Sequence, residues 1–133
     1  MARARAELAR QILRHAPHEE IQEEAMNFFE TLGMLLRRGY LDREMVWGDF
    51  SFHAVRWWHA CSEYVRDERS RKGNDATLFE DFEHLAADLS VMDQAKLARS
   101  RGEVKPSAEA IREFLQEEAA LAKGSPTNDR IVQ

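Results

Sequence analysis

The chain has 133 residues, of which 44% are hydrophobic and 32% are charged, and its formal net charge is −5. This composition excludes a disordered chain, and the apolar runs are far shorter than the roughly 20 residues that a membrane-spanning helix needs. The negative charge argues against nonspecific binding of nucleic acid by the whole domain. Because Cys61 is the only cysteine, no internal disulfide can form, and we expect a soluble cytoplasmic protein with one core.

A basic segment, residues 1–17, begins the chain and predicts a helix over residues 2–15. Its arginines are Arg3, Arg5, Arg10 and Arg14. Its large apolar side chains are only Leu8, Ile12 and Leu13. Because this apolar surface is thin, we expect a loosely attached helix that is solvated or contacts a partner helix or, peripherally, an anionic membrane surface.

Residues 18–92 form the predicted core domain. Its first large helix, predicted over residues 18–38, carries a broad apolar arc at about 100° per residue. The residues of this arc are Ile21, Ala25, Phe28, Phe29, Leu32, Leu35 and Leu36. Phe28 is therefore expected in the core, where its replacement by alanine costs several kcal/mol. Gly39 can adopt the left-handed conformation that ends a helix, with Tyr40 following it.

Two capping signals follow in quick succession. Asp42 predicts the start of a short helix over residues 42–48, and Ser51 predicts the start of a longer helix over residues 51–69. We expect a tight change of direction at Gly48 between them. The apolar face of the longer helix comprises Ala54, Trp57, Trp58, Cys61, Tyr64 and Val65. Cys61 is expected to pack there as a small apolar residue.

The last part of the chain predicts two more helices. The sequence from Thr77 to Glu80 reads as a capping box, and an apolar stripe follows it up to Met92. Residues 93–106 are expected to be a linker or an extension of that helix. Ser107 caps a predicted C-terminal helix over residues 107–123, and residues 124–133 form a tail. The fold class is thus all-α, an irregular orthogonal or antiparallel single-domain bundle of four to six helices.

Several short motifs resemble those of a known family. They are Asn27-Phe28-Phe29-Glu30, Leu32-Gly33, Arg38-Gly39-Tyr40-Leu41-Asp42, Val55-Arg56-Trp57-Trp58 and the segment from Phe79 to Leu85. In this order they resemble a family of small, predominantly bacterial helical proteins known as a domain of unknown function, over roughly residues 20–90. The resemblance implies an all-helical fold and implies no activity, cofactor or catalytic residue. Family members often carry a hydrophobic anchor ahead of the domain, whereas residues 3–14 here are polar.

Metal and hydrolytic chemistry lack a recognisable motif in the sequence. A di-iron bundle would need two inward-facing Glu-x-x-His pairs, and the ridge of Glu80, His84 and Asp88 lies opposite the apolar stripe. No Gly-x-Ser-x-Gly turn or His-Glu-x-x-His helix occurs. We therefore predict no catalytic residue, no metal site and no cofactor. One alternative is a metal-dependent or other enzyme whose site is not visible in the sequence.

The main functional hypothesis is a non-catalytic module that binds a protein partner or self-associates through its outer helices. The candidate partner surface comprises Trp47, Trp57, Trp58, Arg56 and Arg66. Aromatic and arginine side chains are enriched where interfaces gain most of their binding energy. The other alternative is a nucleic-acid-binding protein in which the predicted helices 42–48 and 51–69 act as a helix-turn-helix pair. The sequence identifies no small-molecule ligand.

Overall fold

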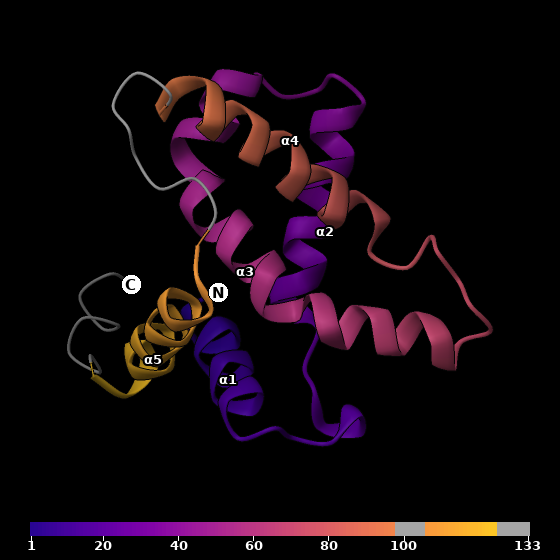
Figure 1. Ribbon diagram of the computed structural model, residues 1–133, viewed down its shortest axis with the longest axis vertical. Coiled ribbons are helices and arrows are strands. Elements are labelled where there is room, and N and C mark those ends of the chain that lie inside the picture. The colour runs from indigo at the N-terminus through magenta and orange to yellow at the C-terminus, as the bar shows by residue number, and fades with distance from the viewer. Residues whose placement is uncertain (98–105, 125–133) are drawn as a thin grey trace.

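The structure is a computed structural model and describes residues 1–97 and 106–124, with side chains described up to residue 121. Its elements are α1 (Ala2–Leu13), a 3-10 turn η1 (His18–Glu20), α2 (Glu24–Arg37), α3 (Arg43–Arg71), α4 (Glu80–Leu97) and α5 (Ala108–Gly124). Figure 1 shows α2, α3 and α4 packed together on one side and α1 beside α5 on the other. The described residues contain only helices and turns, which confirms the all-α single-domain bundle.

The centre of the fold is the crossing of α2 and α4. Phe29 stacks on Phe82 with ring centroids 5.3 Å apart, and Trp58 of α3 packs edge-on against Phe82 at 5.2 Å. Gly33 faces the backbone of Asp81, where the absence of a side chain lets the two helices approach closely. The close approach lets α2, α3 and α4 share one interior around Phe82, which is completely buried.

The orientation of α2 differs from the prediction. The helix begins at Glu24 rather than at residue 18, and Met26 is buried with 1% of its surface exposed. Phe28 is 40% exposed and leans against Phe29 and Phe50. Placing Phe28 in the core was therefore wrong, because the buried face of α2 is rotated toward Met26. The expected large cost of Phe28→Ala does not apply.

The predicted end of α2 and the predicted start of α3 are confirmed. Gly39 has φ = 81°, its N–H donates to the carbonyl of Leu36, and the N–H of Tyr40 donates to the carbonyl of Leu35. These two bonds define the Schellman ending. At α3 the N–H of Met45 donates to the Asp42 carboxylate over 2.9 Å, as expected for an N-cap.

Helix α3 is continuous through Gly48, so the predicted break there was wrong. A single helix spans 29 residues, and Ser51 lies inside it with 6% of its surface exposed. The Ser51 hydroxyl donates to the Asp93 carboxylate of α4 instead of capping a new helix. A glycine inside a helix costs only about 1 kcal/mol, which packing along a long helix easily offsets.

The predicted capping box at the start of α4 was also wrong. The hydroxyl of Thr77 donates to Asp75, and Phe79 has φ = 56°, so the helix begins at Glu80. The capping acceptor comes from α2, because the Glu30 carboxylate accepts the backbone N–H of Phe82 over 2.7 Å. A free amide of the first turn is thus satisfied by a distant helix rather than by a local side chain.

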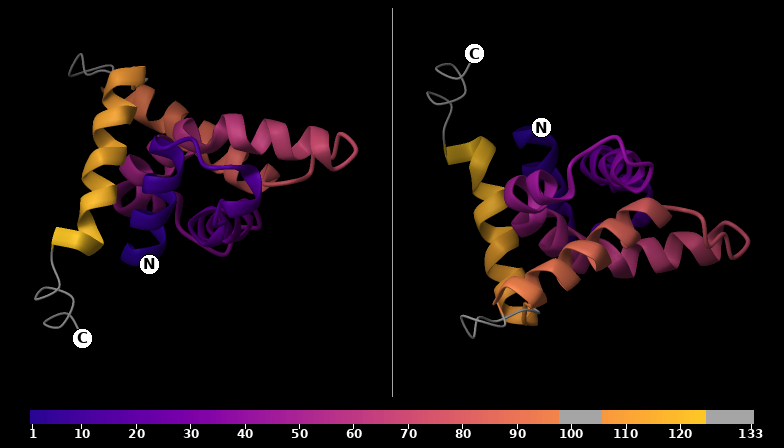
Figure 2. Two further views of the ribbon diagram at one scale, coloured as in Figure 1. Left: turned by 90° about the horizontal axis from the view of Figure 1, so that it is seen from below. Right: turned by 90° about the horizontal axis from the view of Figure 1, so that it is seen from above.

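Helix α1 is packed against the rest of the molecule, which corrects the expectation of a loosely attached segment. Leu8 is 1% exposed and Ala9 is fully buried. Helices α1 and α5 lie side by side and antiparallel (Figure 2). Small alanines allow this close approach, so a thin apolar surface is enough to dock the helix. Three of its arginines form ion pairs within the chain, the partly buried pair of Arg5 with Glu118 and the exposed pairs of Arg10 with Glu7 and of Arg14 with Glu20.

Other predictions concern the core and the ends of the chain. Cys61 is completely buried as predicted, and burial raises the pKa of its thiol, which keeps it in the unreactive protonated form.

The hydroxyl of Ser107 accepts the N–H of Ala110, as expected for its cap. Helix α4 extends to Leu97, so the first part of the predicted linker is helical. The rest of that linker, residues 98–105, and residues 125–133 of the predicted tail lie outside the described residues.

Candidate interaction surface

An open cleft of about 270 Å³ lies between α3 and the end of α4. Its lining residues are Trp47, Gly48, Ser51, Phe52, Arg56, Asp93 and Leu97, and we name it the Trp47 cleft. The unbroken α3 brings Gly48, Phe52 and Arg56 to one side, since they are spaced by four residues along one helix. The cleft is therefore a product of the continuous helix that the sequence did not predict.

The floor of the cleft is a hydrogen-bonded carboxylate. Asp93 accepts the indole N–H of Trp47 over 2.6 Å and the hydroxyl of Ser51 over 3.0 Å on the same oxygen. Lys96 lies over the Trp47 ring at 4.5 Å and donates to Glu44. These contacts fix the Trp47 ring in place, because both its N–H and its face are engaged.

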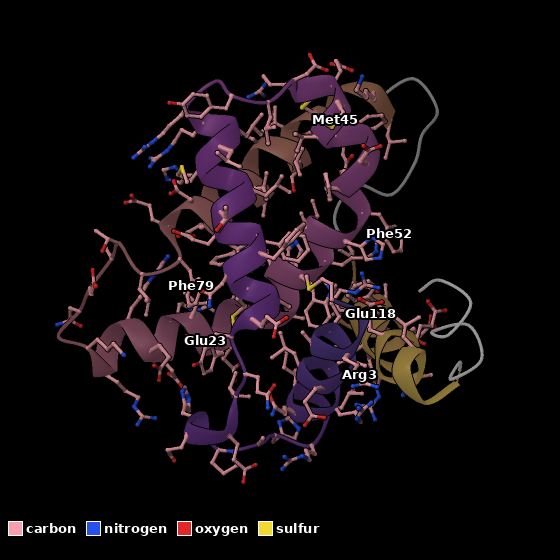
Figure 3. All side chains as sticks on the ribbon, turned by 180° about the vertical axis from the view of Figure 1, so that it is seen from behind. Arg3, Glu23, Met45, Phe52, Phe79 and Glu118 are labelled. Atoms are coloured by element: carbon pink, nitrogen blue, oxygen red, sulfur yellow. The ribbon has the colours of Figure 1, made fainter. Side chains whose placement is uncertain are left out.

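The rim of the cleft is an exposed aromatic ring with a guanidinium against its face. Phe52 is 53% exposed, and the Arg56 guanidinium carbon lies 3.8 Å from its ring centroid. Arg56 donates one bond to the carbonyl of Phe52, and burial lowers its pKa from the usual value. The guanidinium is thus held against the ring by two contacts with Phe52, and its remaining N–H groups can still donate hydrogen bonds. Met45, Phe52 and Glu118 follow one another down one side of the molecule (Figure 3).

The structure brings together only part of the predicted partner surface. Trp47 and Arg56 both line the cleft. Trp57 is 1% exposed and belongs to the core, so it cannot form part of an exposed surface. Trp58 is half-buried against Phe82, and Arg66 is exposed on α3 outside the cleft lining.

Trp57 takes part in a buried polar cluster that joins α1, α3 and α5. Its indole N–H donates to Glu118 over 2.9 Å, and the Nε atom of Arg5 lies 2.9 Å from the same carboxylate oxygen. Glu118 is only 5% exposed, so its charge is balanced inside the molecule by Arg5. A buried pair of this kind is costly to break, because the remaining partner would stay charged and unpaired.

His53 lies between this cluster and the Trp47 cleft, and we expect it to make stability depend on pH. Burial lowers its pKa from the usual 6.5, with Arg5 and Arg56 lowering it further and Glu118 opposing. The unfolded chain therefore takes up the proton first as the pH falls below 6.5, and folding stability falls with it. As the pH is lowered from about 7.5 to about 5, wild type should lose more unfolding free energy than His53→Asn does. Parallel pH profiles for the two proteins would contradict this expectation.

A second group of ionisable side chains ties the turn before α2 to α3. The two ring nitrogens of His18 lie 3.0 Å from Glu68 and 3.1 Å from Asp67, and the ring stacks on Tyr64. Tyr64 donates its hydroxyl to Glu23, and burial together with that bond raises its pKa. Each of these polar groups has a partner within the group, so the contacts hold the segment before α2 against α3.

Three ionisable residues would have revealed a site inside the core if they had converged there. Glu30 instead caps α4, and His84 is exposed. His59 is half-buried on α3. Within residues 1–97 and 106–124, no group of three His, Cys, Asp or Glu residues has the arrangement of a metal site. None of the described helices is long and apolar enough to cross a bilayer.

The helix-turn-helix interpretation loses its structural basis. The predicted first helix, turn and second helix are all parts of α3, so the segment cannot place a separate recognition helix. Arg56 lies against Phe52, and Arg66 lies ten positions further along the same helix. The nucleic-acid hypothesis then depends only on those two cations.

The protein is a small all-α bundle with a packed interior and an open cleft on its surface. The family model described as a domain of unknown function (DUF4760) matches residues 2–89, and the chain belongs to this family. The match covers α1 to most of α4 and ends before α5. Searches of the curated proteins and of the solved structures return no match.

Proposed function

We propose that this chain is a non-catalytic protein-interaction or regulatory module of the cytoplasm and that the Trp47 cleft receives its partner. The observation that carries the proposal is the composition of the cleft. A fixed tryptophan, an exposed phenylalanine and a stacked arginine line a hollow large enough for a partner's side chain. Tryptophan and arginine are the residue types that most often dominate binding energy at protein interfaces.

The charges around the cleft indicate what the partner should present. Among the described residues, no carboxylate lies within ion-pair distance of Arg56, whereas Lys96 is already paired with Glu44. Asp93 accepts hydrogen bonds from Trp47 and Ser51, and its charge acts on Arg56 from beyond ion-pair distance. A partner that places a carboxylate on Arg56 and an apolar side chain beside Phe52 would satisfy both groups.

The test is affinity capture from cells that express the protein, followed by binding measurements with the purified captured protein. Arg56→Glu should weaken binding at least about tenfold, because it reverses the charge that meets the partner's carboxylate. Arg66→Glu is the matched control, since it makes the same change at an exposed position of α3 outside the cleft lining.

Equal binding by wild type and Arg56→Glu would contradict the proposal. Binding of the purified protein to nucleic acid would favour the nucleic-acid alternative. In that case the purified protein would be retained on DNA or RNA at low salt, and both arginine variants would reduce the retention to a similar extent.

A further inference from the structure

Helix α5 occupies a surface that α1 and α3 provide. The contacts come from Arg5, Arg10, Phe52, His53 and Trp57, which we name the α5 seat. On α5 itself the buried residues are Phe114, Leu115 and Glu118, each at most 5% exposed. In Figure 3 Glu118 lies below Phe52 in the same part of the molecule.

The seat recognises a specific pattern of side chains. Phe114 places its ring edge-on to Trp57 at 5.5 Å and to Phe52 at 5.8 Å. One turn later Glu118 accepts the Trp57 N–H and pairs with Arg5. A helix without this carboxylate would leave a buried N–H and a cation unsatisfied, which costs more than losing an exposed bond. The seat therefore selects a helix that reads Phe-Leu-x-x-Glu.

The face of α5 that points away from the seat already lies in water. The outward residues of α5 are exposed and mostly charged, namely Glu109, Arg112, Glu113, Gln116 and Glu117. Three of the buried residues of α1 are alanines, Ala4, Ala6 and Ala9, and each buries less apolar surface than a leucine would. Undocking α5 would uncover Trp57, whereas the ring contacts of Phe82 with Phe29 and with Trp58 do not involve Phe114.

The position of α5 in the chain allows it to reach a second molecule. Positions 98–107 separate Leu97 from Ala108, and ten residues can span up to about 33 Å when extended. The family match ends at residue 89, so α5 lies outside the part that defines the family. Exchange of one terminal element between identical chains is a common route to dimers.

We propose that the α5 seat is a helix receptor and that two copies of this chain exchange α5, each filling the seat of the other. The seat is then filled in the monomer by its own α5 and in the dimer by α5 of the second copy. The seat shares Phe52 with the Trp47 cleft, but the proposal requires no partner in that cleft, because the occupant is part of the chain itself.

The first experiment uses a fluorescent peptide of residues 106–124 and the full-length chain. A full-length variant with Phe114→Ala and Glu118→Gln has a weakened occupant of its own, so the wild-type peptide should bind it at least about tenfold more tightly than it binds wild-type chain. If that variant does not unfold cooperatively, Glu118→Gln alone replaces it. Equal affinity for both chains would overturn the proposal.

Changes in the peptide provide a control that cannot unfold the receptor. Peptide with Glu118→Gln should lose most of its binding, whereas peptide with Glu117→Gln should bind like wild type, because Glu117 is exposed. If both peptides bind equally, the carboxylate is not recognised and the receptor proposal fails.

Exchange between full-length chains is tested by mixing two wild-type pools labelled at the N-terminus with a donor and an acceptor fluorophore. Energy transfer should develop after mixing, and excess peptide 106–124 should abolish it because it competes for the same seat. Absence of energy transfer at concentrations where the peptide binds would show that α5 stays on its own chain and would overturn the exchange.

Discussion

Replacing Gly33 with alanine is expected to lower the free energy of unfolding by about 3 kcal/mol. A Cβ atom at this position would lie 2.2 Å from the carbonyl oxygen of Asp81 and 3.1 Å from the Cβ of Leu85. The nearest atoms belong to the backbone of a neighbouring helix, so no side-chain rotation can make room. Helices α2 and α4 would have to separate where Phe29 and Phe82 stack, and the gain in helix propensity of about 1 kcal/mol is too small to compensate.

Gly48→Ala is the matched control for this prediction. Both glycines lie inside helices, but a Cβ at Gly48 meets no atom within 4 Å. Alanine should therefore stabilise α3 by about 0.5–1 kcal/mol through its better helix propensity. Urea unfolding of the two variants gives the comparison. Similar stability of the Gly33 and Gly48 variants would mean that α2 and α4 do not approach as closely as described.

The sequence predicts helix ends well where the signal is local. Asp42, Gly39 and Ser107 each bond to backbone groups within a few residues, and each prediction is confirmed. Such a signal needs only the neighbouring residues, so sequence alone contains it.

Helix ends are predicted wrongly where a distant side chain competes. Ser51 looks like an N-cap, yet its hydroxyl donates to Asp93 on another helix. Thr77 looks like the start of a capping box, yet Glu30 of α2 supplies the acceptor for α4. The partners lie 42 and 52 positions away in sequence, so no local pattern could identify them.

The sequence alone could not predict which face of α2 is buried. Apolar residues cover much of this helix, and Met26 and Phe28 lie about 200° apart around its axis. A broad apolar surface fits more than one rotation, and contacts with distant residues, such as that of Phe29 with Phe82, select the observed one.

The candidate site was predicted in part. Trp47 and Arg56 were identified from residue type, and they meet in the cleft. Phe52 and Asp93 were missed, although Asp93 falls four positions after Leu89 on the apolar stripe of α4. In the same way Glu118 interrupts the apolar face of the last helix, and it proves to be a buried partner of Trp57. A lone carboxylate on an apolar face is thus the signal that the sequence offered.

The residues that support the family resemblance have structural roles. Phe29 fills the interior, Glu30 caps α4, Gly33 permits the helix crossing, and Gly39 ends α2. These motifs describe how the bundle is assembled. The proposed functional groups, Phe52 and Arg56 among them, lie on the surface, where the bundle holds them in place.

Replacing Phe29 with alanine is the second change with a large expected effect, about 3–5 kcal/mol of lost stability. Phe29 is 2% exposed and stacks on Phe82, so its removal leaves a cavity between α2 and α4. Phe28→Ala is the control, because it removes the same number of atoms from the adjacent position. Phe28 is 40% exposed, and its loss should cost about 1 kcal/mol.

The central claim is that α2, α3 and α4 share one interior in which Phe29, and not Phe28, is buried. The measurement that tests it most directly is the difference in unfolding free energy between Phe29→Ala and Phe28→Ala, obtained by denaturant titration under the same conditions. We expect Phe29→Ala to be less stable by at least about 2 kcal/mol. Equal stabilities, or a less stable Phe28→Ala, would show that α2 presents its other face to the core.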